Sequence, residues 1–313
     1  MVMHVSGRVI VCDEIDTKGI EIMKKCGLQV DYKPEIKPDE LIRSVKDYDI
    51  LVVRSRTKVT KEIIDANPKM KIIARVGVGL DNVDVEYAKS KNIRVINAEA
   101  AAMNAVAELV IGLMLSLARS IPTADAGIKH GKWLKKELKG IELKGKYLGI
   151  VGVGKIGRRI GRIARGFGMN IIGYDVVPID QQFAKEVGLI TTDLNTLLSS
   201  ADFVTLHVPL SNDTKHLINE KRLSLMKKNA YIINTSRGAV IDEQALYKAL
   251  KEGTIAGAAL DVFEVEPPTN SALVQLPNVV CTPHIGAQTA EAQGLAANVI
   301  AERIIQILSE SEF

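Results

Sequence analysis

The chain has few of the residues that would tie it to an extracellular or membrane setting. Its 313 residues include only three cysteines, Cys12, Cys26 and Cys281, which are too few and too scattered for a disulfide framework or a zinc site. We therefore expect three buried thiols in a reducing cytoplasm, and no metal site. No apolar run approaches the roughly 20 residues of a membrane-spanning helix, and the N-terminal residues lack the apolar core of a signal peptide.

An excess of charge of one sign is also missing. Lys and Arg number 41 against 37 Asp and Glu, and the two signs are interspersed, so the formal net charge is only +4. No basic tract therefore points to nucleic acid or a membrane surface as a partner. The hydrophobic content of 47% is that of an ordinary globular protein, and the length favours two domains.

Short β-branched runs alternate with longer helical stretches along the chain. Most of the runs are apolar nearly throughout, as strands buried on both faces must be. Their alternation with helices predicts parallel sheets with right-handed crossovers. The predicted strands are 8–12, 50–54, 72–76, 94–96, 147–151, 170–174, 203–207, 231–234, 257–261 and 279–282.

Two long stretches predict helices with special positions. Residues 100–119 are apolar on nearly every face, so we expect this helix to be buried between two domains or two subunits. Residues 290–308 follow the last strand and have helical apolar spacing. This helix either packs locally or crosses back onto the first domain. We expect the crossing, which gives two connections and a hinged cleft.

The most specific motif is a glycine hexad, Gly152-Val153-Gly154-Lys155-Ile156-Gly157. It follows the predicted strand 147–151 and opens a predicted helix, 158–167. The first glycine permits a tight turn, the second lets the backbone approach a pyrophosphate, and the third allows close packing of helix and strand. Backbone N–H groups and the positive end of the helix dipole suit the phosphates. The hexad therefore predicts a dinucleotide site.

An acidic residue, Asp175, ends the next apolar run, about 20 residues after the hexad, as the fingerprint requires. Its carboxylate suits the ribose hydroxyls and would repel a 2′-phosphate. The following Val176-Val177-Pro178 offers no arginine to hold such a phosphate. We therefore expect NAD rather than NADP.

Four later strands end in polar or titratable residues. These are His207, Thr235-Ser236-Arg237-Gly238, Asp261 and Thr282-Pro283-His284-Ile285-Gly286. Ligands of an open parallel sheet bind outside the carboxyl ends of its strands, so these groups predict one site. His284 is the candidate general acid–base because an imidazole titrates near neutrality. His207 is expected to line the cofactor instead.

Two glutamates, Glu264 and Glu266, compete as the partner of His284, and their spacing in an extended segment does not separate them. A carboxylate bonded to an imidazole fixes its tautomer and favours the protonated ring. Arg237 offers a planar, permanently charged fork that suits a substrate carboxylate. Gly238 leaves room for a ligand close beside it.

The first part of the chain has two further segments after predicted strands, Arg54-Ser55-Arg56-Thr57 and Gly77-Val78-Gly79-Leu80-Asp81-Asn82. A small anion could meet Arg54 and the backbone N–H groups of Gly77 to Gly79. Alternatively, both segments are only turns. The residues taken alone leave this choice open.

Together, these motifs resemble the D-isomer-specific 2-hydroxyacid dehydrogenases. The resemblance runs from about residue 50 to the C-terminus. Besides the hexad and Asp175, it rests on Val53-Arg54-Ser55, 77–84, His207-Val208-Pro209-Leu210, 234–238, 259–263 with Glu266-Pro267, and 283–287.

The resemblance implies an α/β fold of two Rossmann-like or flavodoxin-like lobes with parallel sheets and an interlobe cleft. It implies a discontinuous substrate-binding domain, 1–97 plus 288–313, and an NAD-binding domain, 98–287. It also implies a catalytic trio of Arg237, Glu266 and His284, which selects Glu266 over Glu264. It further implies a homodimer formed through the NAD-binding domains, as is usual in the family.

The resemblance further implies the residues that bind the two ligands. The NAD contacts are Gly152, Gly154, Lys155, Ile156, Gly157, Asp175, His207, Val208, Pro209, Thr235, Ser236, Asp261, Gly286 and Ala287. The substrate contacts are Arg54, Ser55, Gly77, Val78, Gly79 and Asn82, with Lys135 or Lys136 near a substrate phosphate.

Residues 284–293 are similar to the members of the family that oxidise 3-phosphoglycerate, although those members usually have serine where Gln288 stands. We therefore expect NAD-dependent oxidation of that acid. Reduction of glyoxylate or hydroxypyruvate is the alternative within the family. An NAD-binding transcriptional corepressor is the alternative of a different class, and it keeps the same trio.

Overall fold

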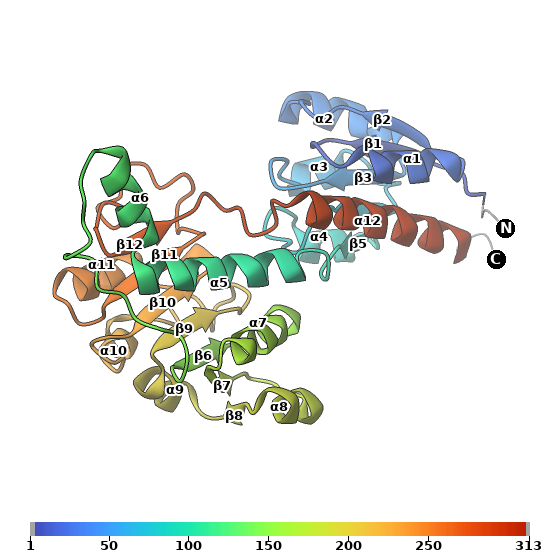
Figure 1. Cartoon of the computed structure of the whole chain (residues 1–313). Coiled ribbons are helices and arrows are strands. Elements are labelled where there is room, and N and C mark those ends of the chain that lie inside the picture. The colour runs from blue at the N-terminus through green and yellow to red at the C-terminus, as the bar shows by residue number, and fades with distance from the viewer. Residues whose placement is uncertain (1–3, 311–313) are drawn as a thin grey trace. The chain divides into compact units, whose positions relative to one another are not determined.

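The computed structural model describes residues 4–310, which fold into two compact units (Figure 1). The first unit contains the described residues up to Met103 and those from Ala287 onward. The second unit runs from Asn104 to Gly286. Each unit has one parallel β-sheet with helices on both faces, so the predicted α/β class is confirmed.

The first unit has a five-stranded sheet of order β2-β1-β3-β4-β5. The strand order reverses between β1 and β3, so their carboxyl ends form the position where ligands of such sheets bind. Its strands are β1 (Arg8–Val11), β2 (Gln29–Tyr32), β3 (Ile50–Val53), β4 (Ile72–Arg75) and β5 (Arg94–Asn97). Its helices are α1 (Thr17–Lys25), α2 (Pro38–Ser44), η1 (Val45–Asp47), α3 (Lys61–Asp65), α4 (Val85–Ser90) and α12 (Ala290–Glu310).

Helices α1 and α12 cover one face of this sheet, and α2, α3 and α4 cover the other. Alternate residues of β1, β3 and β4 supply the two cores, because successive side chains of a strand point to opposite faces. The two covering helices approach closely, since a Cβ on Gly19 of α1 would lie 2.8 Å from the Cβ of Ala297 in α12. The C-terminal helix is therefore part of the first unit's core.

The second unit has a seven-stranded sheet of order β12-β11-β10-β9-β6-β7-β8. The order reverses between β9 and β6, next to the glycine hexad. Its strands are β6 (Tyr147–Val151), β7 (Asn170–Tyr174), β8 (Ile190–Thr191), β9 (Phe203–Leu206), β10 (Tyr231–Asn234), β11 (Gly257–Leu260) and β12 (Val279–Cys281). Its helices are α5 (Met103–Arg119), α6 (Ile121–Lys129), α7 (Lys155–Gly166), α8 (Gln181–Val187), α9 (Leu194–Ser200), α10 (Glu220–Leu223), η2 (Gly238–Val240) and α11 (Glu243–Lys251).

Helix α5 explains the long apolar stretch in the sequence. Nine of its 17 residues are buried, and seven of these, from Ala107 to Ala118, join the core on one face of the second unit's sheet. Within residues 4–310, no single helix has the length and apolar character to cross a membrane. Helices α5 and α6 reach that length and apolar character only when taken together, and their axes are bent by 66° where the two helices meet.

The three cysteines differ in exposure, and the prediction that all are buried is wrong. Cys12 is buried, Cys26 is half-buried and Cys281 is exposed. Cys281 ends β12, the edge strand of its sheet, where one side of the strand has no neighbour to cover it.

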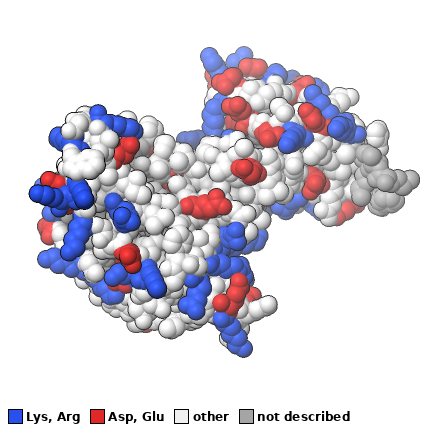
Figure 2. Space-filling view, in the orientation of Figure 1, with Lys and Arg blue, Asp and Glu red and all other residues white. Residues whose placement is uncertain are grey.

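On the face shown in Figure 2, side chains of both charge signs are interspersed, as in the sequence.

Candidate active site

The glycine hexad forms a tight turn between β6 and α7. Gly152 has φ +91°, and a Cβ there would lie 2.5 Å from the carbonyl oxygen of His207. A Cβ on Gly157 would lie 2.3 Å from the carbonyl oxygen of Gly152. Gly154 is the N-cap of α7, and no side chain caps that first turn. The turn therefore has the close packing and the open helix N-terminus that a pyrophosphate needs.

Asp175 lies directly after β7, beside this turn. Its Oδ2 accepts a hydrogen bond from the Val153 N–H at 2.7 Å, and its Oδ1 accepts one from the Val177 N–H at 3.1 Å. Each carboxylate oxygen has two acceptor sites, so both oxygens can still accept hydrogen bonds from hydroxyl groups. The two backbone contacts fix the carboxylate in a position that suits a ribose diol.

A buried hydroxyl group at the end of β10 bears on whether a cofactor fits this site. The Oγ1 atom of Thr235 is buried and has no hydrogen-bond partner among the described residues. Buried hydroxyl groups without a partner are rare, and a bound ligand is one way to satisfy them. The orphaned hydroxyl, the open end of α7 and the Asp175 carboxylate together fit an NAD molecule.

His207, directly after β9, is held in the neutral state. Its Nε2 lies 2.7 Å from Oγ1 of Thr205. Burial lowers the pKa of the imidazole to about 3, because a charged ring would lose its hydration there. A ring that stays neutral at physiological pH is unsuited to carrying a proton, which agrees with a role in lining the cofactor.

His284 and Glu266 form a close pair. Nδ1 of His284 lies 2.8 Å from Oε2 of Glu266, and Oε1 of Glu266 accepts the Phe263 N–H at 3.1 Å. His284 has φ +53°, a conformation that is uncommon for a residue with a side chain. The carboxylate holds one ring nitrogen, so Nε2 is the ring nitrogen left for a substrate proton.

Asp261 holds the backbone around His284. This carboxylate is only 1% exposed and lies directly after β11. It accepts hydrogen bonds from Thr282 Oγ1 at 2.6 Å, the Ile285 N–H at 2.8 Å and the Gly286 N–H at 2.9 Å. Sequence reasoning assigned Asp261 to the cofactor. Its contacts within the chain show that it also positions the segment that bears His284.

Arg237 is brought close to the Glu266 segment by a backbone contact. A Cβ on the next residue, Gly238, would lie 1.9 Å from the carbonyl carbon of Phe263, so only glycine fits there. The amide of Asn234, at the end of β10, donates to the Arg237 carbonyl oxygen at 2.8 Å. Arg237 therefore leaves the sheet beside the segment that carries Glu266.

The structure separates the two competing glutamates. Oε1 of Glu264 lies 3.1 Å from Nε2 of His216 and accepts the Glu243 N–H at 3.1 Å. Glu264 therefore points toward the start of α11, whereas Glu266 contacts His284. The two side chains diverge although they are close in sequence.

In the first unit, the segment after β3 is held at several points. The Asn82 amide donates to the carbonyl oxygens of Arg54 and Thr57 at 2.8 and 2.6 Å. Asn82 was predicted to contact substrate, but its side-chain amide is engaged in shaping this segment. The side chain of Arg54 donates from Nη2 to Oε1 of Gln288 at 2.9 Å.

A second arginine, which sequence reasoning did not select, lies beside the predicted glycine segment. Arg75 ends β4, and a Cβ on Gly77 would lie 1.7 Å from its Nη1. The Asn97 amide donates to the Val78 carbonyl oxygen at 2.5 Å, which holds the glycine segment in place. Arg75 is a strand-end arginine like Arg237, but Val76 separates it from Gly77, whereas Gly238 follows Arg237 directly.

Among residues 4–310, no hydrogen bond or ion pair links Ser55, Lys135 or Lys136 to another side chain. Ser55 is exposed in the segment after β3. Lys135 and Lys136 are exposed in the segment that follows α6, in the second unit. Their assignment to a substrate phosphate stays a prediction.

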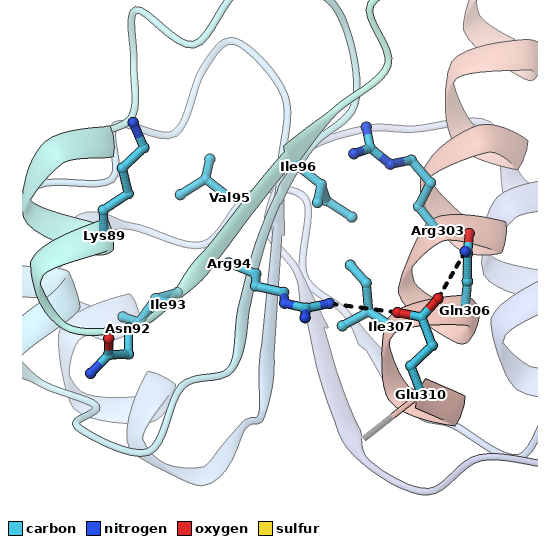
Figure 3. A pocket seen from close by; sticks show the side chains of 10 residues that line it. All are labelled: Lys89, Asn92, Ile93, Arg94, Val95, Ile96, Arg303, Gln306, Ile307 and Glu310. Carbon is cyan, nitrogen blue, oxygen red and sulfur yellow. Dashed lines mark hydrogen bonds and ion pairs between the residues drawn. The ribbon is translucent and has the colours of Figure 1, made fainter. Parts of the chain in front are cut away.

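A groove with a volume of about 530 Å³ lies elsewhere in the first unit (Figure 3). Its walls come from the region around β5 and from the C-terminal half of α12. Figure 3 shows Arg94 paired with Glu310 at 3.9 Å and Gln306 bonded to Glu310 at 3.0 Å. These polar groups satisfy one another, and Arg94 is at the amino end of β5. The groove is therefore separate from the candidate site, which lies at the carboxyl ends. Its lining residues are Lys89, Asn92, Ile93, Arg94, Val95, Ile96, Arg303, Gln306, Ile307 and Glu310.

The fold and the residues at the carboxyl edge define a dinucleotide-binding α/β protein with an acid–base pair. Comparison with known proteins identifies the family. The family model for the NAD-binding domain of D-isomer specific 2-hydroxyacid dehydrogenases matches residues 111–286.

Curated relatives cover nearly the whole chain. The chain is 49% identical to D-3-phosphoglycerate dehydrogenase of Methanocaldococcus jannaschii, over 96% of this chain and 57% of the relative. It is 47% identical to hydroxypyruvate reductase of Thermotoga maritima, over 96% of this chain and 98% of the relative. The chain thus spans little more than half the length of the first relative.

Among solved structures, D-lactate dehydrogenase from Aquifex aeolicus, complexed with NAD and lactic acid, has a TM-score of 0.83 at 30% identity, covering 97% of this chain and 96% of that chain. The chain belongs to the D-isomer specific 2-hydroxyacid dehydrogenase family, and residues 111–286 are its NAD-binding domain.

The low pKa of His207 predicts a pH effect on stability. The unfolded state takes up a proton below about pH 6.5, whereas the folded state does so only near pH 3. His207 therefore lowers stability progressively as the pH falls through this window. Denaturant unfolding should show that His207→Asn makes the free energy of unfolding fall less steeply between about pH 6.5 and 4. An unchanged slope would contradict a buried neutral ring.

Proposed function

We propose that the chain catalyses NAD-dependent oxidation of D-3-phosphoglycerate to 3-phosphohydroxypyruvate, a step that supplies serine synthesis. The observation that carries the proposal is the His284–Glu266 pair, with its 2.8 Å contact, at the same sheet edge as Arg237 and the glycine hexad. Oxidation of a hydroxy acid removes a proton from the hydroxyl oxygen and a hydride from its carbon, so it needs an acid–base group beside a dinucleotide site, and this edge supplies both.

Each member of the trio has a distinct task in this proposal. Arg237 binds the substrate carboxylate and polarises the C2 oxygen. Nε2 of His284 takes the hydroxyl proton, and Glu266 stabilises the imidazolium that results. The bound NAD accepts the hydride from C2. Asp261 keeps His284 at the correct place through the backbone of its segment.

The proposal assigns the two ends of the substrate to different groups. Arg54 and the N–H groups of the Gly77–Gly79 segment bind the carboxylate end of the substrate. Lys135 or Lys136 reaches the phosphate. The 49% identity with a phosphoglycerate dehydrogenase supports this choice of substrate.

A reductase of hydroxypyruvate is the second candidate. The observation in its favour is the 47% identical relative of that name, of which the chain covers 98%. Both reactions use the same acid–base chemistry, so the candidates differ only in what contacts the far end of the substrate.

We also infer a homodimer formed through the second unit. Three large apolar side chains are exposed on and after α6, with Ile121 49%, Ile128 59% and Trp133 77% exposed. Burying an aromatic side chain of this size in a protein interface is favourable. A second copy of the chain is the partner that the family resemblance indicates, and its NAD-binding domain would cover this surface.

Replacing His284 by alanine should lower turnover about 10²-fold or more, because the proton of the hydroxyl group loses its acceptor. Binding of NAD should be unchanged, since the imidazole acts on the substrate. Steady-state kinetics and NAD titration measure the two effects. Wild-type turnover in the His284→Ala variant would remove His284 from the mechanism.

A panel of acids tests the substrate. It contains D-3-phosphoglycerate, D-glycerate, D-lactate, hydroxypyruvate and glyoxylate, with NAD or NADH as appropriate. A cation that contacts the phosphate contributes about 1.5–3 kcal/mol, so kcat/KM should be at least tenfold higher for phosphoglycerate than for glycerate. Equal use of these two acids would favour the hydroxypyruvate reductase, and no turnover of any acid would overturn both candidates.

The proposed dimer should dissociate when the exposed apolar side chains on and after α6 are replaced by polar ones. Sedimentation should give twice the monomer mass for the wild-type protein and a shift toward monomer for the double variant Ile128→Ser, Trp133→Ser, because the apolar contact is lost. Ile190→Ser on β8 alters another exposed apolar residue and should leave the mass unchanged. A wild-type monomer at micromolar concentration would contradict the proposal.

A further inference from the structure

The segment after β3 carries two arginines, Arg54 and Arg56. Only the Arg56 side chain is held by several groups of the surrounding backbone. The Arg56 guanidinium donates to the carbonyl oxygens of Ile36 at 3.1 Å and Pro34 at 2.6 Å, and also to that of Cys12. It also pairs with Asp13 at 3.2 Å. Arg56 is thus part of the scaffold, and the ligand-binding task in this segment falls to Arg54.

Asp13 is the group around which this segment folds. It lies just beyond β1, at the strand-order reversal, and is 2% exposed. Its Oδ2 accepts the Arg54 N–H at 2.5 Å and the Thr57 N–H at 3.2 Å, and its Oδ1 accepts Thr57 Oγ1 at 2.6 Å. Every one of these hydrogen bonds goes to the segment that contains Arg54.

We propose that Asp13 is a positioning residue that acts on substrate through Arg54. The inference rests on the proposed function and goes beyond it, because Asp13 is buried and its hydrogen bonds go to Arg54 and Thr57. A buried carboxylate is costly, and buried ion pairs can often be replaced by apolar residues without loss of stability. An apolar residue could not accept hydrogen bonds from the Arg54 and Thr57 N–H groups. By accepting both, Asp13 fixes the direction of the backbone from which the Arg54 side chain starts.

The side chain of Arg54 has a second contact that completes its placement. Its Nη2 donates to the Gln288 amide oxygen at 2.9 Å. An amide oxygen is neutral, so it orients the guanidinium without neutralising it. Arg54 is therefore oriented at its backbone by Asp13 and at its tip by Gln288, and it keeps its charge for an anionic substrate.

The main test is a double-mutant cycle with Asp13→Asn and Arg54→Gln. Asp13→Asn should raise KM for the hydroxy acid about tenfold, with kcat changed less than threefold and KM for NAD unchanged, because uniform substrate binding is lost. In the Arg54→Gln background, Asp13→Asn should change KM less than twofold, since the two act as one unit. A tenfold effect in both backgrounds would overturn the proposal.

Asp49→Asn is the matched control. Asp49 also accepts a backbone N–H, that of Arg8 at 2.9 Å, and pairs with Lys71 at 3.1 Å, but it lies at the opposite end of the same sheet. It should leave KM for the acid unchanged. If Asp13→Asn does not fold, Thr57→Val removes one hydrogen bond to Asp13 and should raise KM about threefold. Unchanged KM in Thr57→Val would then count against the proposal.

Two readouts do not require turnover and so separate this inference from the proposed function. Amide exchange should be faster for Arg54 and Thr57 in Asp13→Asn, and unchanged exchange would overturn the inference. Calorimetry with oxalate, a small dicarboxylate, should show weaker binding to Asp13→Asn than to wild type, and the double variant should bind oxalate no more weakly than Arg54→Gln alone. Inactivity on every acid would reject the proposed function alone, whereas equal oxalate affinity, or none for wild type, would reject the role of Asp13.

Discussion

The candidate site depends most on the buried carboxylate of Asp261. Three hydrogen bonds from the segment after β12 converge on it, from a hydroxyl and two backbone N–H groups, each within 2.9 Å. They hold the backbone where His284 takes the uncommon φ of +53°. Without such contacts the left-handed conformation would relax, and the imidazole would lose its alignment with Glu266. The acid–base pair is thus a consequence of a carboxylate that itself lies out of contact with solvent.

The first unit uses the same construction. Asp13 follows β1 and holds the segment after β3, its neighbour in the sheet, just as Asp261 follows β11 and holds the segment after β12. Asn234, at the end of β10, shapes the turn that carries Arg237. Parallel strands make this possible because their carboxyl ends meet at one edge, where a short polar side chain reaches the loop of the next strand. Both units therefore build a loop at the candidate site around a buried polar group rather than around apolar packing.

Much of this could be predicted from the sequence, for identifiable reasons. Central strands buried on both faces appear as apolar runs, and every predicted strand corresponds to an observed one. The edge strands β2 and β8 were missed, because β2 is largely exposed and polar and β8 has only two residues. The divergence of Glu264 and Glu266 depends on the path of the backbone after β11. Asp13 gave no signal, since its importance comes from a segment about 40 residues away that only the sheet order brings near.

The arrangement also explains why similarity identifies the chemistry more firmly than the substrate. In the proposed mechanism, the hexad, Asp175, Asp261 and the His284–Glu266 pair serve steps that every oxidation of a 2-hydroxy acid shares, so they would be the same whether the acid carries a phosphate or a hydroxyl group. Only groups beyond C2 differ between such substrates. In the proposed complex, the residues of this chain that contact that part of the substrate are the exposed lysines after α6. Under this proposal, a substitution at these lysines would alter the preferred acid without disturbing the fold, because both side chains are exposed and lie outside the cores of the sheet.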